Sequence, residues 1–252
     1  MIRFAYYSSS VQSFVAESPQ SVVGVLAKHH PHDLDVLQRN SWIAQIELLQ
    51  RELSELEDGW IAFEFAIPRM GKRVDNIVLF GGVVFVLEFK VGADQVTASA
   101  IDQATDYALD LKNFHAGSHN LPIVPIVIAT TAVSGGSQIV WSADGVAQAV
   151  PSNGVALGTL IKKVARDRCT GVDVDPAMWV TSGYKPTPTI IEAAQALYRG
   201  HRVDEITRSG AGAINLSQTA DCIAQIIDEA TAKKHKAICF VTGVPAVRPW
   251  PG

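Results

Sequence analysis

The stretch that decides the fold is Arg73–Lys90, RVDNIVLFGGVVFVLEFK. Two runs rich in β-branched and aromatic residues flank Gly81-Gly82, a pair that favours a type I′ turn because both central residues adopt positive φ. A two-residue turn fixes the register of the hairpin, and this register places Asp75 opposite Glu88. Because side chains alternate along a strand, Asp75, Glu88 and Lys90 are predicted to share one face.

A pair of carboxylates directly across a β-ladder is destabilising on its own, because like charges repel. Asp75 and Glu88 therefore indicate a bound cation, and a hard cation such as Mg²⁺ prefers oxygen ligands of this kind. Lys90, one pleat beyond Glu88, is placed to orient a water molecule or a phosphate. The hairpin predicts a metal-dependent phosphodiesterase site, and the alternative for a Glu-x-Lys pair is a solvated strand face.

Two motifs in this region resemble those of a known family. Asp75, twelve intervening residues and then Glu88-Phe89-Lys90 resemble the core motif of the PD-(D/E)XK nuclease superfamily, with Val74 where proline is usual. Gln103 and Tyr107 resemble the Gln-x-x-x-Tyr element of RecB-like exonuclease domains, and their i, i+4 spacing puts both on one helix face. The order and separation of the two motifs match the family.

The resemblance implies a fold, a metal and a set of roles. The fold would be an α/β restriction-endonuclease-like core, in which helices flank a mixed sheet. Asp75, Glu88 and the carbonyl of Phe89 would hold Mg²⁺, or Mn²⁺ in its place. The side chains that the resemblance implies in catalysis are those of Asp75, Glu88, Lys90, Gln103 and Tyr107.

The resemblance also implies a further acidic ligand from the region before the hairpin. A helix is predicted there at roughly 42–57, capped by Asn40-Ser41. Glu47 lies at the edge of the apolar stripe of this helix and is the candidate. Its rival is Glu64, in a strand predicted at Trp60–Ile67 from its alternating pattern. The face of this strand away from Glu64 is predicted to carry Ile61, Phe63, Phe65 and Ile67.

Basic residues near the acidic strand predict contacts with nucleic acid. Arg69, Lys72 and Arg73 could bind phosphates, with a solvated loop as the alternative. A helix predicted at 154–168 has a basic face formed by Lys162, Lys163, Arg166 and Arg168. This face could contact the phosphate backbone, but a solvent-exposed helix face is the simpler interpretation. The net charge of −4 gives no overall attraction to nucleic acid, so binding would depend on local patches or metal ions. DNA is favoured over RNA as the partner.

The elements after the hairpin predict a layered core. A helix at about 99–114 is followed by a nearly continuous apolar strand at 121–131. Strand, helix and strand in this order predict a right-handed crossover to a parallel strand. Together with three antiparallel strands before the helix, this arrangement is an α/β core.

The composition is that of a globular protein, with 252 residues of which 48% are hydrophobic and 18% charged. No apolar run is long enough to span a membrane and no secretory signal is visible, so no membrane partner is expected. The three cysteines are widely spaced, which favours a reduced, cytoplasmic setting. The sequence specifies neither an oligomeric state nor a protein partner.

The C-terminal part predicts a second unit at 186–252, mainly helical, after a nuclease-like domain at 1–185. It is expected to end in a strand at 236–241 followed by Thr242-Gly243-Val244-Pro245. Many phosphate-binding loops begin this way, but Gly-x-Gly-Lys-[Ser/Thr] does not follow and prolines do, so no ATP site is expected. The whole chain resembles a bacterial family that joins a nuclease domain to a Schlafen-group-type DNA/RNA helicase domain, cut at the start of the ATPase.

Two other functions remain open on the sequence alone. The nuclease fold could serve as a module that binds nucleic acid or a partner protein without cleaving anything. The chain could also be a folded but inactive fragment of a helicase. Metal-dependent cleavage distinguishes the nuclease from both.

Overall fold

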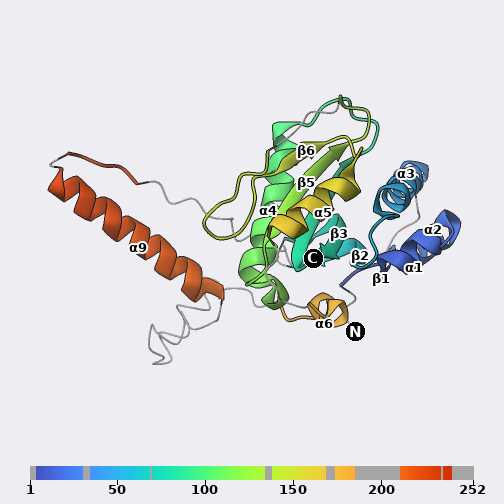
Figure 1. Ribbon diagram of the computed structural model, residues 1–252, viewed down its shortest axis with the longest axis horizontal. Helices are drawn as coiled ribbons and strands as arrows, with labels where there is room; N and C mark the ends of the chain where they lie inside the picture. The colour runs from blue at the N-terminus through green and yellow to red at the C-terminus, as the bar shows by residue number, and fades with distance from the viewer. Residues whose placement is uncertain are drawn as a thin grey trace, which may run out of the picture.

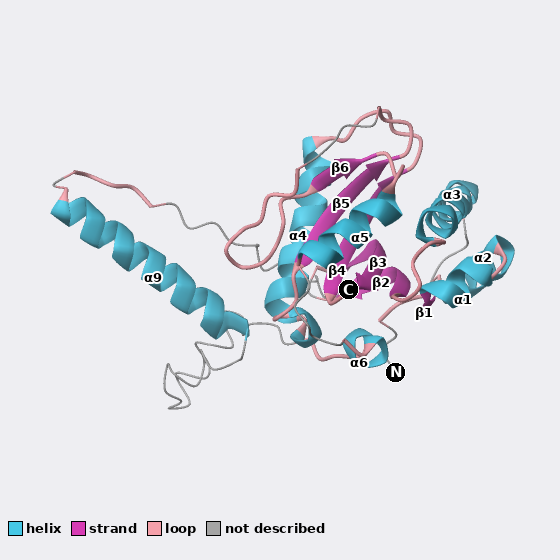
Figure 2. Cartoon of the chain, viewed as in Figure 1, coloured by secondary structure: helices cyan, strands magenta, loops and turns pink. Residues whose placement is uncertain are grey.

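The computed structural model describes residues 4–30, 35–68, 70–133, 138–168, 174–184, 211–233 and 235–239. These residues form a mixed α/β structure in which helices flank a six-stranded sheet (Figure 1; Figure 2). The strands are β1 (Tyr7–Ser10), β2 (Trp60–Ile67), β3 (Lys72–Phe80), β4 (Val83–Lys90), β5 (Ile123–Ala129) and β6 (Val150–Ser152). They lie in chain order across the sheet. The neighbours from β1 to β4 are antiparallel, whereas β5 and β6 continue the sheet in parallel.

Helices cover both faces of this sheet. The helices of the described residues are α1 (Val11–Ala16), α2 (Pro19–His29), α3 (Val36–Leu53), α4 (Ala98–Phe114), η1 (Ala116–Ser118), α5 (Leu157–Asp167), α6 (Pro176–Val180) and α9 (Ala211–Ala232), of which α9 does not cover the sheet (Figure 1). Figure 1 shows α4 on one side of the sheet and α5 on the other. Helices α1 to α3 pack in the same core as α5, and α4 and α6 pack in the opposite one.

The predicted hairpin is confirmed in its turn and its register. Gly81 and Gly82 have φ of 56° and 73°, and the pairs run from Phe80↔Val83 to Asn76↔Leu87 as expected. The predicted connection through a helix to a parallel strand is confirmed as well, because α4 connects β4 to a parallel β5. A two-residue turn with both φ values positive matches the twist of the strands it joins.

Alternation along β4 divides the interior into two cores. Phe85 and Leu87 pack toward α3 and α5, whereas Val84 and Val86 pack toward α4. The strand is buried on both faces, which explains why its sequence is a continuous apolar run and shows no polar alternation. Glu88, the next even-numbered residue, therefore lies on the α4 face.

The predicted alternation of β2 is wrong in its second half. Ile61 and Phe63 pack in the core on the α3 and α5 face, whereas Phe65 and Ile67 pack in the core on the α4 face. Between the two pairs lies Glu64, whose φ of 52° falls in the left-handed region. One left-handed residue in a strand reverses the side to which the following side chains point, so a single residue lets β2 contribute to both cores.

Helix α3 begins earlier than the sequence predicted. Asp35 is its N-cap, and the Asp35 carboxylate accepts the backbone N–H of Leu37 at 3.3 Å. Asn40 and Ser41, the predicted cap, therefore lie inside the helix. Strand β6 was not predicted at all, because three residues are too few to show a periodic pattern.

The C-terminal predictions are only partly covered by the structure. Helix α9 agrees with the mainly helical segment expected there, and its contacts include α4. Residues 236–239 form no strand, and residues 240–252, with the proposed start of a phosphate-binding loop, lie outside the described residues. The boundary predicted at 185/186 also lies outside them. Within the described part of the chain, none of the helices has the length and apolar character needed to cross a membrane.

Two glycines in helices predict opposite effects of the same substitution. A Cβ added to Gly158 in α5 would lie 2.1 Å from the carbonyl oxygen of Glu52, whereas a Cβ on Gly24 in α2 would meet nothing within 4 Å. Gly158→Ala is expected to lower the free energy of unfolding by about 1–3 kcal/mol, because α5 must shift away from α3. Gly24→Ala is expected to raise it by about 0.5–1 kcal/mol, because alanine is the better helix former. Urea denaturation measures both, and a stabilising Gly158→Ala would contradict the close helix contact.

Candidate active site

The hairpin ladder opens where the acidic residues lie. Regular pairing of β3 with β4 reaches Asn76↔Leu87 and stops there. Beyond this pair, the backbone N–H of Phe89 donates a 2.7 Å hydrogen bond to Oδ2 of Asp75 and not to a strand carbonyl. In an extended strand the N–H and C=O of one residue point to the same edge, so the Phe89 carbonyl faces the same opening.

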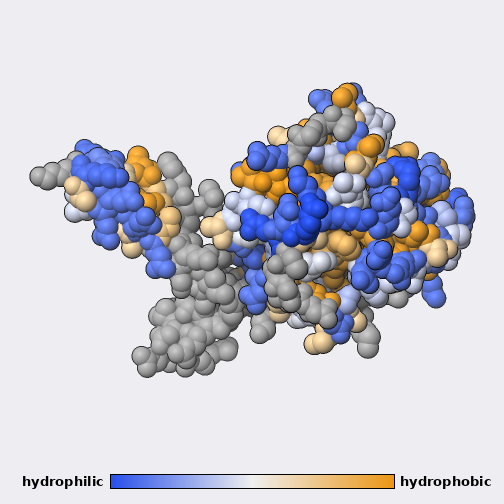
Figure 3. Space-filling view, viewed as in Figure 1, coloured by the Kyte–Doolittle hydropathy of each residue, from blue (hydrophilic) through white to orange (hydrophobic). Residues whose placement is uncertain are grey.

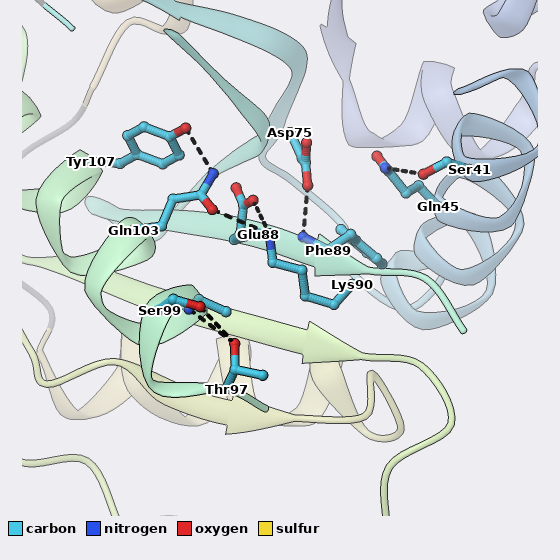
Figure 4. Close-up of polar contacts among 11 residues, drawn as sticks. Ser41, Gln45, Asp75, Glu88, Phe89, Lys90, Thr97, Ser99, Gln103 and Tyr107 are labelled. Carbon is cyan, nitrogen blue, oxygen red and sulfur yellow. Dashed lines mark hydrogen bonds and ion pairs between the residues drawn. The ribbon is translucent and has the colours of Figure 1, made fainter. Parts of the chain in front are cut away.

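The other predicted catalytic side chains form a chain of hydrogen bonds (Figure 4). Nζ of Lys90 lies 2.9 Å from Oε1 of Glu88 and donates to Oε1 of Gln103 at 3.2 Å. Nε2 of Gln103 in turn donates to the hydroxyl of Tyr107 at 2.9 Å. The two α4 residues lie one turn apart on the face toward β4, so the helix motif and the strand motif meet. Helix α4 is positioned by Thr97, whose hydroxyl caps its first turn.

Strand β2 adds a third carboxylate beside the predicted pair. The β2–β3 pairs Phe63↔Asn76 and Phe65↔Val74 flank Glu64 and Asp75, so these two acids are neighbours, and Asp75 and Glu88 are the next residues beyond the last β3–β4 pair, Asn76↔Leu87. Three adjacent strands therefore carry carboxylates at one level of the sheet. Burial is the main cause that raises the pKa of Asp75 and Glu88, and the charge of Glu64 adds to the rise of both.

Helix α3 and a neighbouring arginine hold Glu64 in place. Its Oε1 accepts a 2.8 Å hydrogen bond from the indole N–H of Trp42 and a 3.5 Å bond from Nε2 of Gln38. Its carbonyl accepts a hydrogen bond from the guanidinium of Arg73, which also lies 4.0 Å above the ring centroid of Tyr6. A left-handed backbone costs a non-glycine residue about 1–3 kcal/mol, and such strain persists only where the surroundings enforce it.

Glu47, the other candidate for the extra acidic ligand, lies on the protein surface. It is exposed and follows the buried Gln45 by two residues, which puts it on a different side of α3. The structure therefore brings Glu64 together with Asp75 and Glu88 and leaves Glu47 apart.

The three basic residues predicted to bind nucleic acid have different environments. Lys72 is exposed at the start of β3, and its charge slightly opposes the rise that burial causes in the pKa of Glu88, so it lies near the site. Arg73 is already occupied by Glu64 and Tyr6, which indicates a structural role. Arg69 lies outside the described residues.

Burial and mutual repulsion make the carboxylates hard to ionise. Burial, followed by the charge of Glu88, raises the pKa of Asp75 well above its usual value. Burial also raises the pKa of Glu88, although the hydrogen bond and charge of Lys90 oppose the rise. Burial likewise raises the pKa of Glu64. The pKa of Tyr107 is raised to about 12, mainly by burial, so its hydroxyl stays protonated at neutral pH.

The site offers oxygen atoms suited to a hard cation. Among the described residues, Oε2 of Glu88 is buried and has no hydrogen-bond partner, and both amide atoms of the buried Asn76 are also unpaired. Leaving such atoms unpaired is costly. As the described side chains stand, no three His, Cys, Asp or Glu residues converge into a metal site. The ligand types that fit Mg²⁺ are the carboxylates of Asp75 and Glu88 with the carbonyl of Phe89.

Comparison with known proteins does not assign the site. No protein-family model matches the chain, and no similar protein was found among curated sequences or solved structures.

Sequence reasoning missed the residues that support Glu64. Trp42 is fully buried, with its indole N–H aimed at the carboxylate, and Arg73 binds backbone where phosphate binding was predicted. The available signal was a tryptophan in an otherwise aliphatic helix stripe, because a buried indole N–H usually needs a partner.

The strain at Glu64 predicts an unusual order of stability between two variants. Glu64→Gly and Glu64→Ala remove the same carboxylate and the same hydrogen bonds, but only glycine adopts positive φ without cost. Glu64→Gly is therefore expected to be more stable than Glu64→Ala by about 1–2 kcal/mol. At the neighbouring Ala66, substitution by glycine is expected to destabilise by about 0.5–1 kcal/mol. Chemical denaturation tests this order, and equal stability of the two Glu64 variants would show that no strain is stored.

The raised carboxylate pKa values predict that Asp75 costs stability at neutral and alkaline pH. An acid whose pKa is higher in the folded state destabilises it fully above that pKa, and the cost disappears as pH falls below the pKa of the unfolded state. Asp75→Asn, whose amide oxygen still accepts from Phe89, is expected to raise the melting temperature at pH 8. The difference from the wild type should shrink toward pH 4.

The control for this experiment is Asp102→Asn, which changes an exposed carboxylate on α4. Melting curves in EDTA from pH 4 to pH 8 measure both variants against the wild type. An Asp75→Asn difference that is the same at every pH, or that matches that of the control, would contradict a raised pKa of Asp75 in the folded state.

Proposed function

We propose that the protein is a metal-dependent nuclease of the PD-(D/E)XK type that hydrolyses phosphodiester bonds in nucleic acid. The observation that carries the proposal is the contact between two separate motifs. Lys90 of the strand motif lies between Glu88 and Gln103, and Gln103 continues to Tyr107. A solvated Glu-x-Lys pair would not need a buried glutamate or a helix amide aligned with it.

The carboxylates would hold the metal. Asp75 and Glu88, with the Phe89 carbonyl, supply the oxygen ligands, and Glu64 supplies further negative charge from β2. When bound, Mg²⁺ or Mn²⁺ polarises the scissile phosphate and lowers the pKa of a water molecule. The unpaired Oε2 of Glu88 supports this role, because a buried carboxylate oxygen without a hydrogen-bond partner is unfavourable unless a ligand binds it.

The remaining residues would act on the phosphate and on the attacking water. The ammonium of Lys90 can stabilise negative charge that develops on the phosphate or orient the water by a hydrogen bond. Gln103 accepts a hydrogen bond from Lys90 and donates one to Tyr107, so it limits the positions that the ammonium can adopt. Tyr107, kept protonated by its raised pKa, is a positioning residue.

The proposal predicts metal-dependent cleavage that requires the strand motif. Labelled single- and double-stranded DNA and RNA are incubated with Mg²⁺, Mn²⁺ or EDTA. Wild-type protein is expected to cleave at least one of them in the presence of metal, and Asp75→Ala or Lys90→Ala to reduce the rate about 100-fold or more. Circular dichroism should show that both variants keep the fold. Full activity of the Lys90 variant would refute the assignment, and a wild type that binds but never cleaves would identify a binding module.

A matched pair of variants tests the third carboxylate. Glu64→Gln and Glu47→Gln make the same chemical change on neighbouring elements, but only Glu64 lies beside Asp75. Glu64→Gln is expected to slow cleavage and to raise the Mg²⁺ concentration needed for half-maximal rate, and Glu47→Gln to leave both unchanged. The opposite result would return the role to Glu47.

A further inference from the structure

Helix α5 carries a pocket that has no part in the proposed active site. A cavity of about 250 Å³ lies between α5 and the segment 138–141. Its apolar lining comes from Ile139, Leu160 and Val164, all of which belong to or pack against the core beneath α5. Figure 3 shows hydrophilic side chains gathered over α5, with hydrophobic residues beside them.

One wall of this pocket is formed by the guanidinium of Arg168, which stacks on the ring of Trp141. The guanidinium carbon of Arg168 lies 4.2 Å from the ring centroid of Trp141, and both residues line the cavity. One side of Trp141 packs on the core. The outer side of the guanidinium is a flat cationic surface of the kind on which nucleobases stack.

The basic residues around the pocket differ in whether they form ion pairs. Lys162 pairs with Glu55 at 3.2 Å, and Arg166 lies 3.7 Å from Asp167. Lys163, which lines the cavity, is exposed and forms no ion pair with another described residue. The pocket therefore joins a flat stacking surface to an uncompensated ammonium, and Gln138 and Asp167 add hydrogen-bonding groups to its wall.

The pocket lies far from the carboxylates. Gly81 in the hairpin turn packs against Ala165 of α5, because a Cβ added to Gly81 would lie 2.7 Å from the Cβ of Ala165. The C-terminal half of α5 therefore lies at the end of the sheet that holds the hairpin turn. Lys90 lies at the other end of β4, about 23 Å away for an extended strand of this length. Its side chain also points to the α4 face, opposite α5.

We propose that this pocket binds one nucleobase of a single-stranded nucleic acid, stacked on the Arg168–Trp141 pair, with the adjoining phosphate at Lys163. The volume is below the range of about 300–1,000 Å³ typical of sites that enclose a whole ligand, so it suits a single base projecting from a strand. The base edge then meets Gln138 and Asp167, and the chain continues over the surface of α5. A free nucleotide presents the same chemistry, and the experiment distinguishes the two sources.

Binding of a fluorescently labelled single-stranded oligonucleotide is measured by anisotropy with the full chain in EDTA. Because no cleavage is needed, the result does not depend on the proposed nuclease activity. Lys163→Gln and Arg168→Gln are each expected to weaken binding about fivefold and to lower the slope of log K against log salt by about 0.7. Lys162→Gln removes the same charge one residue away, outside the pocket, and is expected to change neither value.

Two further ligands test the stacked base. An oligonucleotide with abasic sites is expected to bind the wild type about tenfold more weakly than the intact strand and to bind Arg168→Gln with little further loss. A mononucleotide that competes as well as the oligonucleotide would identify a free nucleotide as the ligand of the same pocket. Equal binding of intact and abasic strands, equal weakening by Lys162→Gln and Lys163→Gln, or no binding of either ligand would overturn the proposal.

Discussion

The burial of three neighbouring carboxylates is the constraint on which the rest of this structure depends. Glu64, Asp75 and Glu88 lie at one level on adjacent strands, in surroundings that raise the pKa of each. Each acid is held by a different donor, an indole N–H, a backbone N–H and an ammonium. Burying three such groups without partners would cost more than a typical domain can tolerate, so these donors are a condition for folding as well as for chemistry.

The donors also explain local features of the fold. The backbone N–H of Phe89 can donate to the Asp75 carboxylate because regular pairing of β3 with β4 ends at Asn76↔Leu87. The indole comes from α3, so the helical layer is tied to the sheet at Glu64. The left-handed backbone at Glu64 turns the rest of β2 toward the α4 core. The carboxylate site and the contribution of β2 to both cores therefore meet at Glu64.

The sequence predicted the parts of this arrangement that depend on neighbouring residues. A two-glycine turn determines the hairpin register, and that register is observed as far as Asn76↔Leu87, the pair next to Asp75 and Glu88. The i, i+4 spacing predicted that Gln103 and Tyr107 act together, and the structure joins them by a hydrogen bond. These features need no information from distant parts of the chain.

The rest could not be predicted because it depends on tertiary contacts. The apolar residues of β2 keep the same spacing whether or not the strand reverses at Glu64, so alternation alone selected the wrong face for Phe65 and Ile67. At the reversal, Glu64 contacts Arg73 of β3 and Trp42 of α3, which lie on other elements and are not part of the strand pattern. Glu47 could not be placed for the same reason. It lies at the edge of the apolar stripe of its helix, and the sequence does not specify on which side of that stripe the acidic strands pack.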